Sequence, residues 1–180
     1  MPKPKYKTLR HLLTKEMVTS EGPETAELFR SLRHVKRCKV LTKQELIDIC
    51  HWKSPRALRL IESNYPATVR RLTHKALSTR SEQKRIEYLT QLRGVGLPMA
   101  SAILTLADPR RYGVIDVRVW RVLLAIKAVR KSPRGIGFSF KNWYHYLCKL
   151  RHHAKELNVP VRTVELTLFY YHRKIQKGVL

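Results

Sequence analysis

The sequence is poor in acidic residues. Asp and Glu number 13 among 180 residues, against 37 Lys and Arg, so the formal net charge is +24 with histidine neutral. A small domain needs a net charge of only about 2 to 8 units to stay soluble, so this net charge is far larger than solubility requires. The imbalance indicates a polyanionic partner, and nucleic acid is favoured over an anionic membrane surface.

Cysteines are few and widely separated. Cys38, Cys50 and Cys148 include no pair with the spacing of a metal knuckle, so the sequence predicts neither a disulfide framework nor a zinc or iron–sulfur site. No segment approaches the roughly 18 apolar residues of a membrane span, and no signal-like segment follows the first residues. We expect a cytoplasmic, nucleoid-associated protein with no membrane contact.

What is present is a helical pattern. Apolar residues make up 43% of the chain, enough for a core, and they recur almost everywhere with a period of 3.6. Thr42 with Glu45 forms a capping box, and Ser81 can cap a later helix. One helix is expected from Thr25 through Arg37, and Gly135 and Gly137 precede the last two helices. The predicted fold class is all-α.

Residues 92–104 are the most informative segment. Gly94 and Gly96 join two expected helices, and this spacing lets the backbone adopt left-handed angles and approach another surface closely. The N–H groups that open the second helix then face an anion, for which a DNA phosphate is the natural candidate, with Arg93 adding charge. Taken alone, these residues are explained equally well by a glycine C-cap between two core helices.

About twenty residues later, an apolar approach leads to Asp116 at the start of a helix. Aspartate is a favoured N-cap, and the helix N-terminus keeps its carboxylate ionised, which is the state an electrostatic catalyst needs. Arg118 and Arg121 are three residues apart on the helix that follows. They can clamp a phosphate or pair with acidic side chains.

Together the two segments resemble the helix-hairpin-helix (HhH-GPD) DNA glycosylase superfamily over roughly residues 40–126. The matching residues are Leu92, Gly94, Val95, Gly96, Ala100, Ile103 and Leu104, then Ile115, Asp116, Val119, Arg121, Val122 and Leu123. The resemblance implies two helical lobes with a cleft between them. It also implies that Arg93, Gly94, Val95 and Gly96 contact the DNA backbone and that Asp116 is the catalytic residue.

The resemblance further implies how the chain is organised. A basic arm, residues 1–20, would precede a single glycosylase-like body, residues 21–180. Within that body, residues 40–112 would form the hairpin-bearing lobe, and residues 21–39 with 113–180 the second lobe. The implied protein is a monomer that binds double-stranded DNA and needs no cofactor. A monovalent cation on the carbonyls of Leu92 and Val95 is the one ion that the resemblance allows.

Two departures from the family pattern shape the implied activity. Members that also cut the strand carry a lysine where this chain has Pro98, and the C-terminal iron–sulfur loop of many members is absent. The resemblance therefore implies a monofunctional glycosylase, unless a lysine such as Lys53 reaches the pocket. Such an enzyme flips a modified or damaged base from the duplex and hydrolyses its N-glycosidic bond. Repair and defence against phage DNA with modified bases both fit.

The base pocket is less well marked. Trp52 beside Lys53 is a candidate for stacking on the base, and a core tryptophan explains it equally well. Tyr144 belongs to an aromatic cluster of which most members are expected in the interior. Glu165 lies in an apolar stripe, where a structural ion pair with an arginine is favoured over recognition of a base.

His152 and His153 indicate a solvated basic face, because no ligand spacing supports a metal site. Two other functions also fit these residues. One is a catalytically inactive helix-hairpin-helix module that binds duplex DNA, in which Asp116 is a cap and nothing more. The other is a helical RNA-binding protein, which competition between duplex DNA and structured RNA would distinguish.

Overall fold

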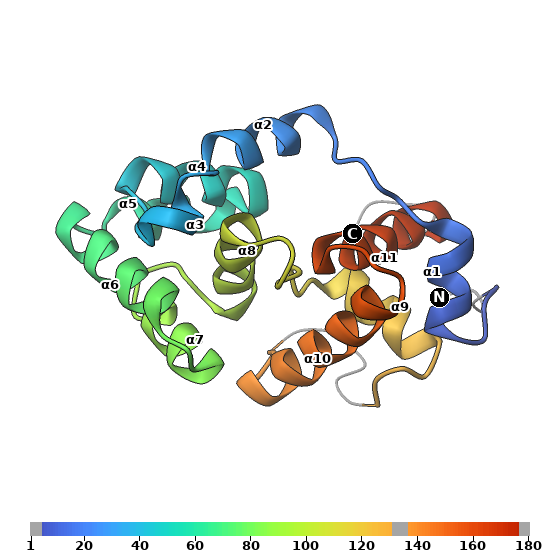
Figure 1. Cartoon of the computed structure of the whole chain (residues 1–180). Coiled ribbons are helices and arrows are strands. Elements are labelled where there is room, and N and C mark those ends of the chain that lie inside the picture. Colours follow the sequence, from blue (N-terminus) through green and yellow to red (C-terminus); the bar gives the residue numbers. More distant parts are fainter. Residues whose placement is uncertain (1–4, 131–136, 177–180) are drawn as a thin grey trace. The chain divides into compact units, whose positions relative to one another are not determined.

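The computed structural model describes residues 5–130 and 137–176 (Figure 1). These residues form eleven α-helices, one short 3-10 helix and no strand, so the all-α prediction is confirmed. Gly135 lies outside the described residues. The elements are α1 (Leu9–Glu16), α2 (Pro23–Ser31), α3 (Val35–Cys38), α4 (Lys43–Lys53), η1 (Pro55–Ala57), α5 (Leu58–Glu62), α6 (Pro66–Ser78), α7 (Glu82–Thr90), α8 (Leu97–Ala107), α9 (Val117–Ala125), α10 (Phe140–Glu156) and α11 (Val161–Ile175).

Local capping signals set several helix boundaries. The predicted capping box opens α4: the Glu45 N–H donates to Thr42 Oγ1 at 3.2 Å, and the Thr42 N–H donates to Glu45 Oε2 at 2.7 Å. Ser81 caps α7 by accepting from the Lys84 N–H at 3.3 Å. These bonds satisfy N–H groups that have no partner inside the helix, which is why the capping residues mark the helix starts.

The single helix expected from Thr25 through Arg37 is two helices. α2 ends at Ser31 and α3 begins at Val35, and the Leu32 N–H closes the first of them on the Leu28 carbonyl at 3.1 Å. Leu32 and Val35 are both buried. The apolar spacing therefore continues across the break, because it records which side faces the core and not where the backbone turns.

The chain divides into two compact units. Unit 1 comprises Met1–Ser20 and Arg110–Leu180, and unit 2 comprises Glu21–Pro109. Residues 21–39 thus group with the Gly94 segment, whereas the sequence placed them with residues 113–180. Within the described residues, no helix combines the length and the apolar character needed to cross a membrane.

The N-terminal segment is part of unit 1 rather than a separate basic arm. Leu12 and Leu13 of α1 are fully buried, and α1 packs against α11. Glu16 joins the two helices, because its carboxylate accepts from Tyr6 Oη at 2.7 Å and from Lys174 Nζ at 2.8 Å. The hydrogen bond to Glu16 raises the pKa of Tyr6 to about 12, while the same bonds lower the pKa of Glu16.

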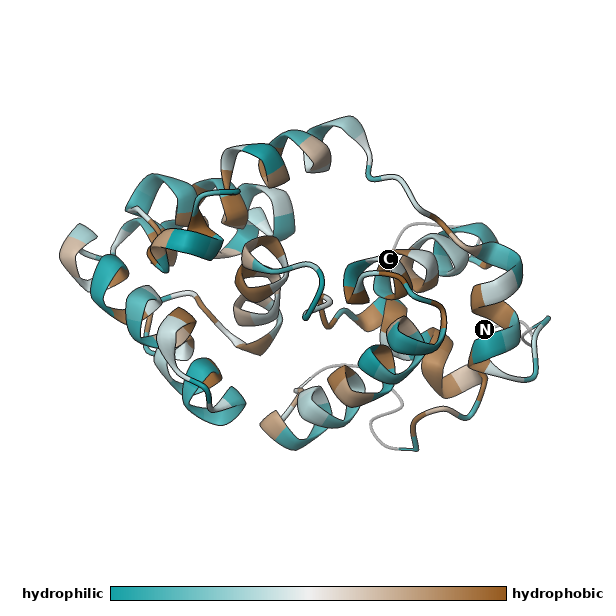
Figure 2. Cartoon of the chain, viewed as in Figure 1, coloured by the Kyte–Doolittle hydropathy of each residue, from teal (hydrophilic) through white to brown (hydrophobic). Residues whose placement is uncertain are grey.

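The core of unit 2 is built around α8. All residues from Met99 to Ala107 are buried, and the helix packs against α4 and α7. Figure 2 shows the corresponding apolar colouring along α8, in contrast to the hydrophilic outer sides of α6 and α7. A helix that is apolar on every side must be surrounded by protein, so α8 fixes the positions of the segments at its two ends.

The core of unit 1 is built around α11, which packs against α1, α9 and α10. The segment 112–115 runs between these helices with its side chains buried. A Cβ at Gly113 would lie 2.8 Å from Leu150 Cδ1 and 2.9 Å from Glu165 Cβ. A glycine is therefore required here by close packing against α10 and α11.

We expect Gly113→Ala to destabilise the protein by about 1 to 3 kcal/mol, because the added methyl group overpacks this contact. Urea unfolding followed by circular dichroism measures the change, with Lys7→Ala at an exposed position of unit 1 as the control. An unchanged unfolding midpoint for Gly113→Ala would contradict the packing described here.

Candidate nucleic-acid interface

The turn between α7 and α8, residues 91–96, is here called the glycine turn. Gly94 has φ +80°, so the predicted left-handed backbone is confirmed there. A Cβ at Gly94 would lie 3.0 Å from Leu60 Cβ and 3.1 Å from the Ile61 nitrogen, which shows that the turn packs tightly on α5. Gly96 has φ −85° and is not left-handed.

Gly96 instead provides an open surface. It is exposed, and a Cβ added there would meet nothing closer than Pro98 Cδ at 3.9 Å. Gly96 has no side chain to cap α8, whose first backbone hydrogen bond runs from the Ala100 N–H to the Gly96 carbonyl at 2.9 Å. Pro98 occupies the first turn of α8 as predicted, so the leading N–H groups belong to Leu97 and Met99.

Asn64 holds the glycine turn in place and was not singled out by sequence reasoning. It is 5% exposed. Its Oδ1 accepts from the Arg93 N–H and its Nδ2 donates to the Arg93 carbonyl, both at 2.9 Å, and Nδ2 also donates to the Ile61 carbonyl at 2.8 Å. In the sequence Asn64 stands two residues before Pro66, which by itself indicates only the end of a helix. A buried amide that bridges two chain segments has no periodic signature.

The other residues of the glycine turn are placed around Arg93, which the hydrogen bonds of Asn64 hold. The Val95 N–H donates to the Leu92 carbonyl at 3.1 Å, and both side chains are buried beneath the turn. Arg93 is exposed beside Gly96. The turn therefore presents one cation, one glycine and the first N–H groups of a helix, which together suit an anion. A cation on the Leu92 and Val95 carbonyls stays a prediction.

Asp116 caps α9, as the sequence indicated. Its Oδ1 accepts from the Arg118 N–H at 2.8 Å, and its backbone is extended at φ −138° and ψ 151°. The residue is half-buried, so it is neither sealed in the core nor fully solvated. The helix N-terminus stabilises the ionised carboxylate at this position.

The segment before Asp116 is anchored from two sides. The Val114 N–H donates to Glu165 Oε2 at 3.3 Å, and Tyr146 Oη donates to the Val114 carbonyl at 2.7 Å. Burial, together with the nearby Glu165 and Asp116, raises the pKa of Tyr146 well above its usual value, so its hydroxyl keeps the proton that it donates. These two bonds set the direction in which the chain reaches Asp116.

Glu165 belongs to the core of unit 1. It is 1% exposed and forms a buried salt bridge with Arg162, one turn away on α11. The ion-pair interpretation is confirmed. Because Glu165 also receives the Val114 N–H, we assign it a structural role in place of a position in a base pocket.

The cations near Asp116 lie on the same helix. The Arg118 guanidinium stands 5.3 Å from the centre of the Phe169 ring, in a cation–π contact with α11, and Arg121 is half-buried. Facing them from α11 is His172, which is 1% exposed and whose Nε2 finds no hydrogen-bond partner within the described residues. Burial first, and then Arg121 and Arg118, lower the pKa of His172, while Asp116 opposes the shift.

His172 is the second residue that sequence reasoning missed. Its signal is its spacing, because it lies seven residues after Glu165 and four after Leu168, on the buried side of α11. A buried imidazole with an open nitrogen near a carboxylate is a common feature of functional sites.

The three remaining base-pocket candidates are divided between the units. Trp52 and Lys53 end α4 in unit 2, and Trp52 Nε1 donates to Thr25 Oγ1 at 3.0 Å. Tyr144 lies on α10 in unit 1, is 43% exposed and stacks on Phe140 at 5.7 Å between ring centres. The structure thus places Asp116, Arg118, Arg121 and Tyr144 in one unit, and the glycine turn with Trp52 and Lys53 in the other.

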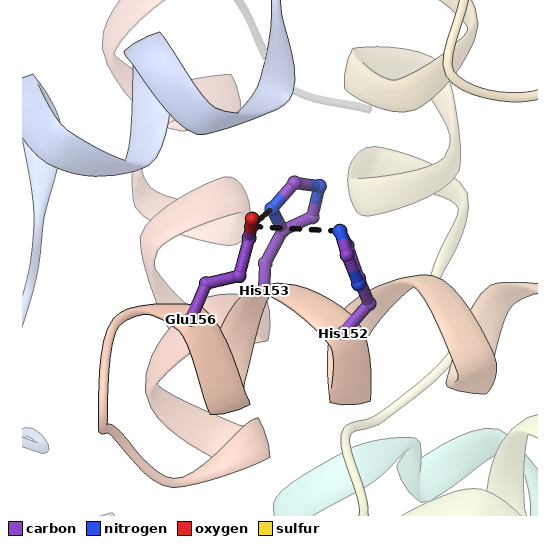
Figure 3. A group of neighbouring side chains, drawn as sticks. All are labelled: His152, His153 and Glu156. Carbon is purple, nitrogen blue, oxygen red and sulfur yellow. Dashed lines mark hydrogen bonds and ion pairs between the residues drawn. The ribbon is translucent and has the colours of Figure 1, made fainter.

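One cluster has the donor types of a metal site (Figure 3). His152, His153 and Glu156 of α10 bring one donor atom each within 4.8 Å of one another. His153 Nδ1 lies 2.9 Å and His152 Nε2 3.5 Å from the same carboxylate oxygen, Glu156 Oε2. Zn²⁺ accepts such donors. The contacts are also those of a surface His–Glu network, in which burial lowers the pKa of His153 and the hydrogen bond to Glu156 opposes that shift.

Comparison of the chain with protein-family models, curated proteins and solved structures found no match.

We expect the protein to lose stability as the pH falls below about 6.5, the ordinary pKa of histidine. The folded state lowers the pKa of His172, so below 6.5 the unfolded chain binds a proton that the folded chain resists. This contribution is present above 6.5 and is lost on acidification. Urea unfolding at pH 7.5 and 5.5 measures it.

The matched comparison is between two histidine variants. His172→Gln should flatten the pH dependence of the free energy of unfolding, whereas His74→Gln, at an exposed position on α6, should leave the slope of the wild type. Equal slopes for wild type and His172→Gln would show that His172 does not titrate in this range.

Proposed function

We propose that this protein is a monofunctional DNA glycosylase that removes a modified or damaged base from duplex DNA. The observation that carries the proposal is Asp116, a half-buried carboxylate held at the N-terminus of α9 by the Arg118 N–H. The resemblance of residues 92–104 and 115–123 to helix-hairpin-helix glycosylases supports the same role for this residue.

Binding of DNA is supported by charge and by the glycine turn. The net charge of +24 favours a polyanion and predicts strong dependence of affinity on salt. Exposed Gly96 and the leading N–H groups of α8 suit a backbone phosphate, and exposed Arg93 adds a cation beside them. Such contacts position the protein on the duplex without reading its sequence.

The proposed chemistry is hydrolysis of the N-glycosidic bond. After the nucleotide is flipped from the stack, the bond from C1′ to the base breaks and the base leaves with the electron pair, so positive charge develops on the sugar. The Asp116 carboxylate stabilises that charge and orients a water molecule. The water oxygen bonds to C1′, and one of its protons ends on the departing base, which leaves an abasic site.

Strand cleavage through a Schiff base is not part of the proposal. Pro98 stands where the strand-cutting members of the family carry lysine, and a proline ring offers no primary amine. Both repair of damaged bases and defence against phage DNA with modified bases fit an enzyme that leaves an abasic site.

Asp116→Asn tests the catalytic role. Asparagine is as good an N-cap as aspartate, so the fold should keep its stability, but the charge that stabilises the sugar cation is lost. We expect base release to fall at least about 100-fold while duplex affinity stays within about twofold. The assay uses duplexes that carry different modified bases, followed by alkaline cleavage of abasic sites.

The matched control is Asp48→Asn, which removes an exposed carboxylate from α4. This variant should release bases at the rate of the wild type. Full activity of Asp116→Asn would reject the assignment of Asp116, and its electrophoretic or anisotropy binding curves would show that the variant is folded and still binds.

Gly96→Ser tests the phosphate contact. Serine is a better N-cap than glycine, so stability should be unchanged or higher, yet its hydroxyl would take the N–H that a phosphate needs and its Cβ would fill the open surface. We expect duplex affinity to fall about tenfold. Gly22→Ser is the control, because Gly22 caps α2 in the same manner and in the same unit.

A DNA-binding module without catalytic activity is the second candidate. The observation in its favour is that the hydrogen bond from the Arg118 N–H by itself explains an aspartate at position 116. In that case the wild type releases no base from any substrate, and Gly96→Ser still weakens duplex binding. Stronger binding of structured RNA than of duplex DNA at matched salt would point to the RNA-binding alternative.

A further inference from the structure

A basic pocket lies in unit 1, and neither Asp116 nor a residue of the glycine turn is among its lining residues. Its cavity is about 650 Å³, and Arg110, Arg111, Arg151, Lys155, Asn158 and Val161 are among the residues that line it. Four of these side chains are cations. Among the described residues that form its wall, none is acidic. We name it the Arg110 pocket.

The pocket is built from three neighbouring segments. Arg110 and Arg111 open the segment that leads to α9, and Arg151 and Lys155 are four residues apart on α10, so their side chains share one face of that helix. Asn158 belongs to the turn between α10 and α11, and Val161 is the first residue of α11. Val161 is buried, and the other five residues are at least partly exposed. The cavity is therefore open to a ligand.

Two of the arginines are held in fixed positions. Arg151 Nε donates to the Arg111 carbonyl at 3.0 Å. The guanidinium groups of Arg111 and Arg151 lie 5.4 Å and 5.1 Å from the centre of the Tyr112 ring, which is 3% exposed. These cation–π contacts with a buried ring restrain both arginine side chains, which would otherwise extend into solvent.

The turn that closes the pocket is also fixed. Asn158 has φ +53°, and the Val159 N–H donates to the Ala154 carbonyl at 2.9 Å, which ends α10 in a Schellman arrangement. The Val161 N–H donates to the Arg110 carbonyl at 3.4 Å. This brings the start of α11, a helix of 15 residues with no side-chain cap, to the wall of the pocket, and its dipole adds positive potential there.

We propose that the Arg110 pocket binds a phosphate group. Several cations confined to one cavity repel one another, and an anion removes that repulsion while it gains charge-assisted hydrogen bonds. The planar fork of arginine matches the oxygens of phosphate, and lysine supplies a point charge. The phosphate can come from a nucleic-acid backbone or from a small phosphorylated molecule, and both sources share this chemistry.

The proposal stands independently of the glycosylase reaction. If the protein acts on DNA, the pocket supplies a backbone contact in unit 1 in addition to the one proposed for the glycine turn. If the reaction is rejected by the Asp116→Asn experiment, binding of phosphate by the pocket is unaffected. The two proposals can therefore fail separately.

The test uses the full chain and a double variant, Arg110→Gln with Lys155→Gln. Both side chains are exposed, and the hydrogen bond of Arg110 to Val161 uses its carbonyl, so the fold should be kept. Arg10→Gln with Lys15→Gln is the control, because it removes the same charge from exposed positions of α1 in the same unit. Circular dichroism verifies that both variants are folded.

In the first arm, inorganic phosphate is titrated at constant ionic strength and followed by ³¹P NMR. We expect the double variant to bind phosphate at least about tenfold more weakly than the wild type, and the control to stay within about twofold. Equal affinity in the wild type and the double variant, or an equal loss in both variants, would overturn the proposal, since the general positive field would then explain the binding.

In the second arm, a short duplex DNA is bound at several salt concentrations. Where the backbone is the source, the double variant should lower the slope of log affinity against log salt by about 1 for each lost contact, and the control should not. An unchanged slope together with loss of inorganic phosphate binding would keep the phosphate site and assign it to a small phosphorylated molecule.

Discussion

The position of Asp116 depends on a buried ion pair that contains no residue of the proposed reaction. Glu165 and Arg162 form a salt bridge inside unit 1, and Glu165 also receives the Val114 N–H. A buried charge is costly unless it is paired and hydrogen-bonded, so the carboxylate holds both partners at once. Tyr146 Oη also donates to the Val114 carbonyl, so both backbone groups of Val114 are held. These bonds fix the direction in which the chain reaches Asp116.

The acidic residues are few, and their contacts within the fold account for the positive charge of the surface. The carboxylates that the structure describes are largely engaged within the fold: Glu45 closes the first turn of α4, Glu16 joins α1 to Lys174, and Asp116 caps α9. Acids that bridge or cap in this way leave much of the cationic surplus on the outside. The surplus of Lys and Arg is therefore available to an external polyanion, and its attraction acts over about 10 Å at moderate salt.

Sequence reasoning succeeded where the signal is local. The capping box at Thr42, the cap at Asp116 and the left-handed Gly94 each depend on a few neighbouring residues, and each is present. It failed where distant contacts decide the outcome. α1 packs against the distant α11 and has Leu12 and Leu13 buried. Asn64 matters because it bonds to Arg93, and His172 is buried among helices that no local pattern brings together.

The division of the chain has a consequence for the order in which it folds during synthesis. Unit 2 is one continuous segment, so its α8 core can assemble once Pro109 has emerged from the ribosome. Unit 1 draws on both ends of the chain, and α1 is translated long before the α11 surface that buries it. About 150 residues of translation separate α1 from α11, so Leu12 and Leu13 can be buried against that helix only after most of the chain has been made.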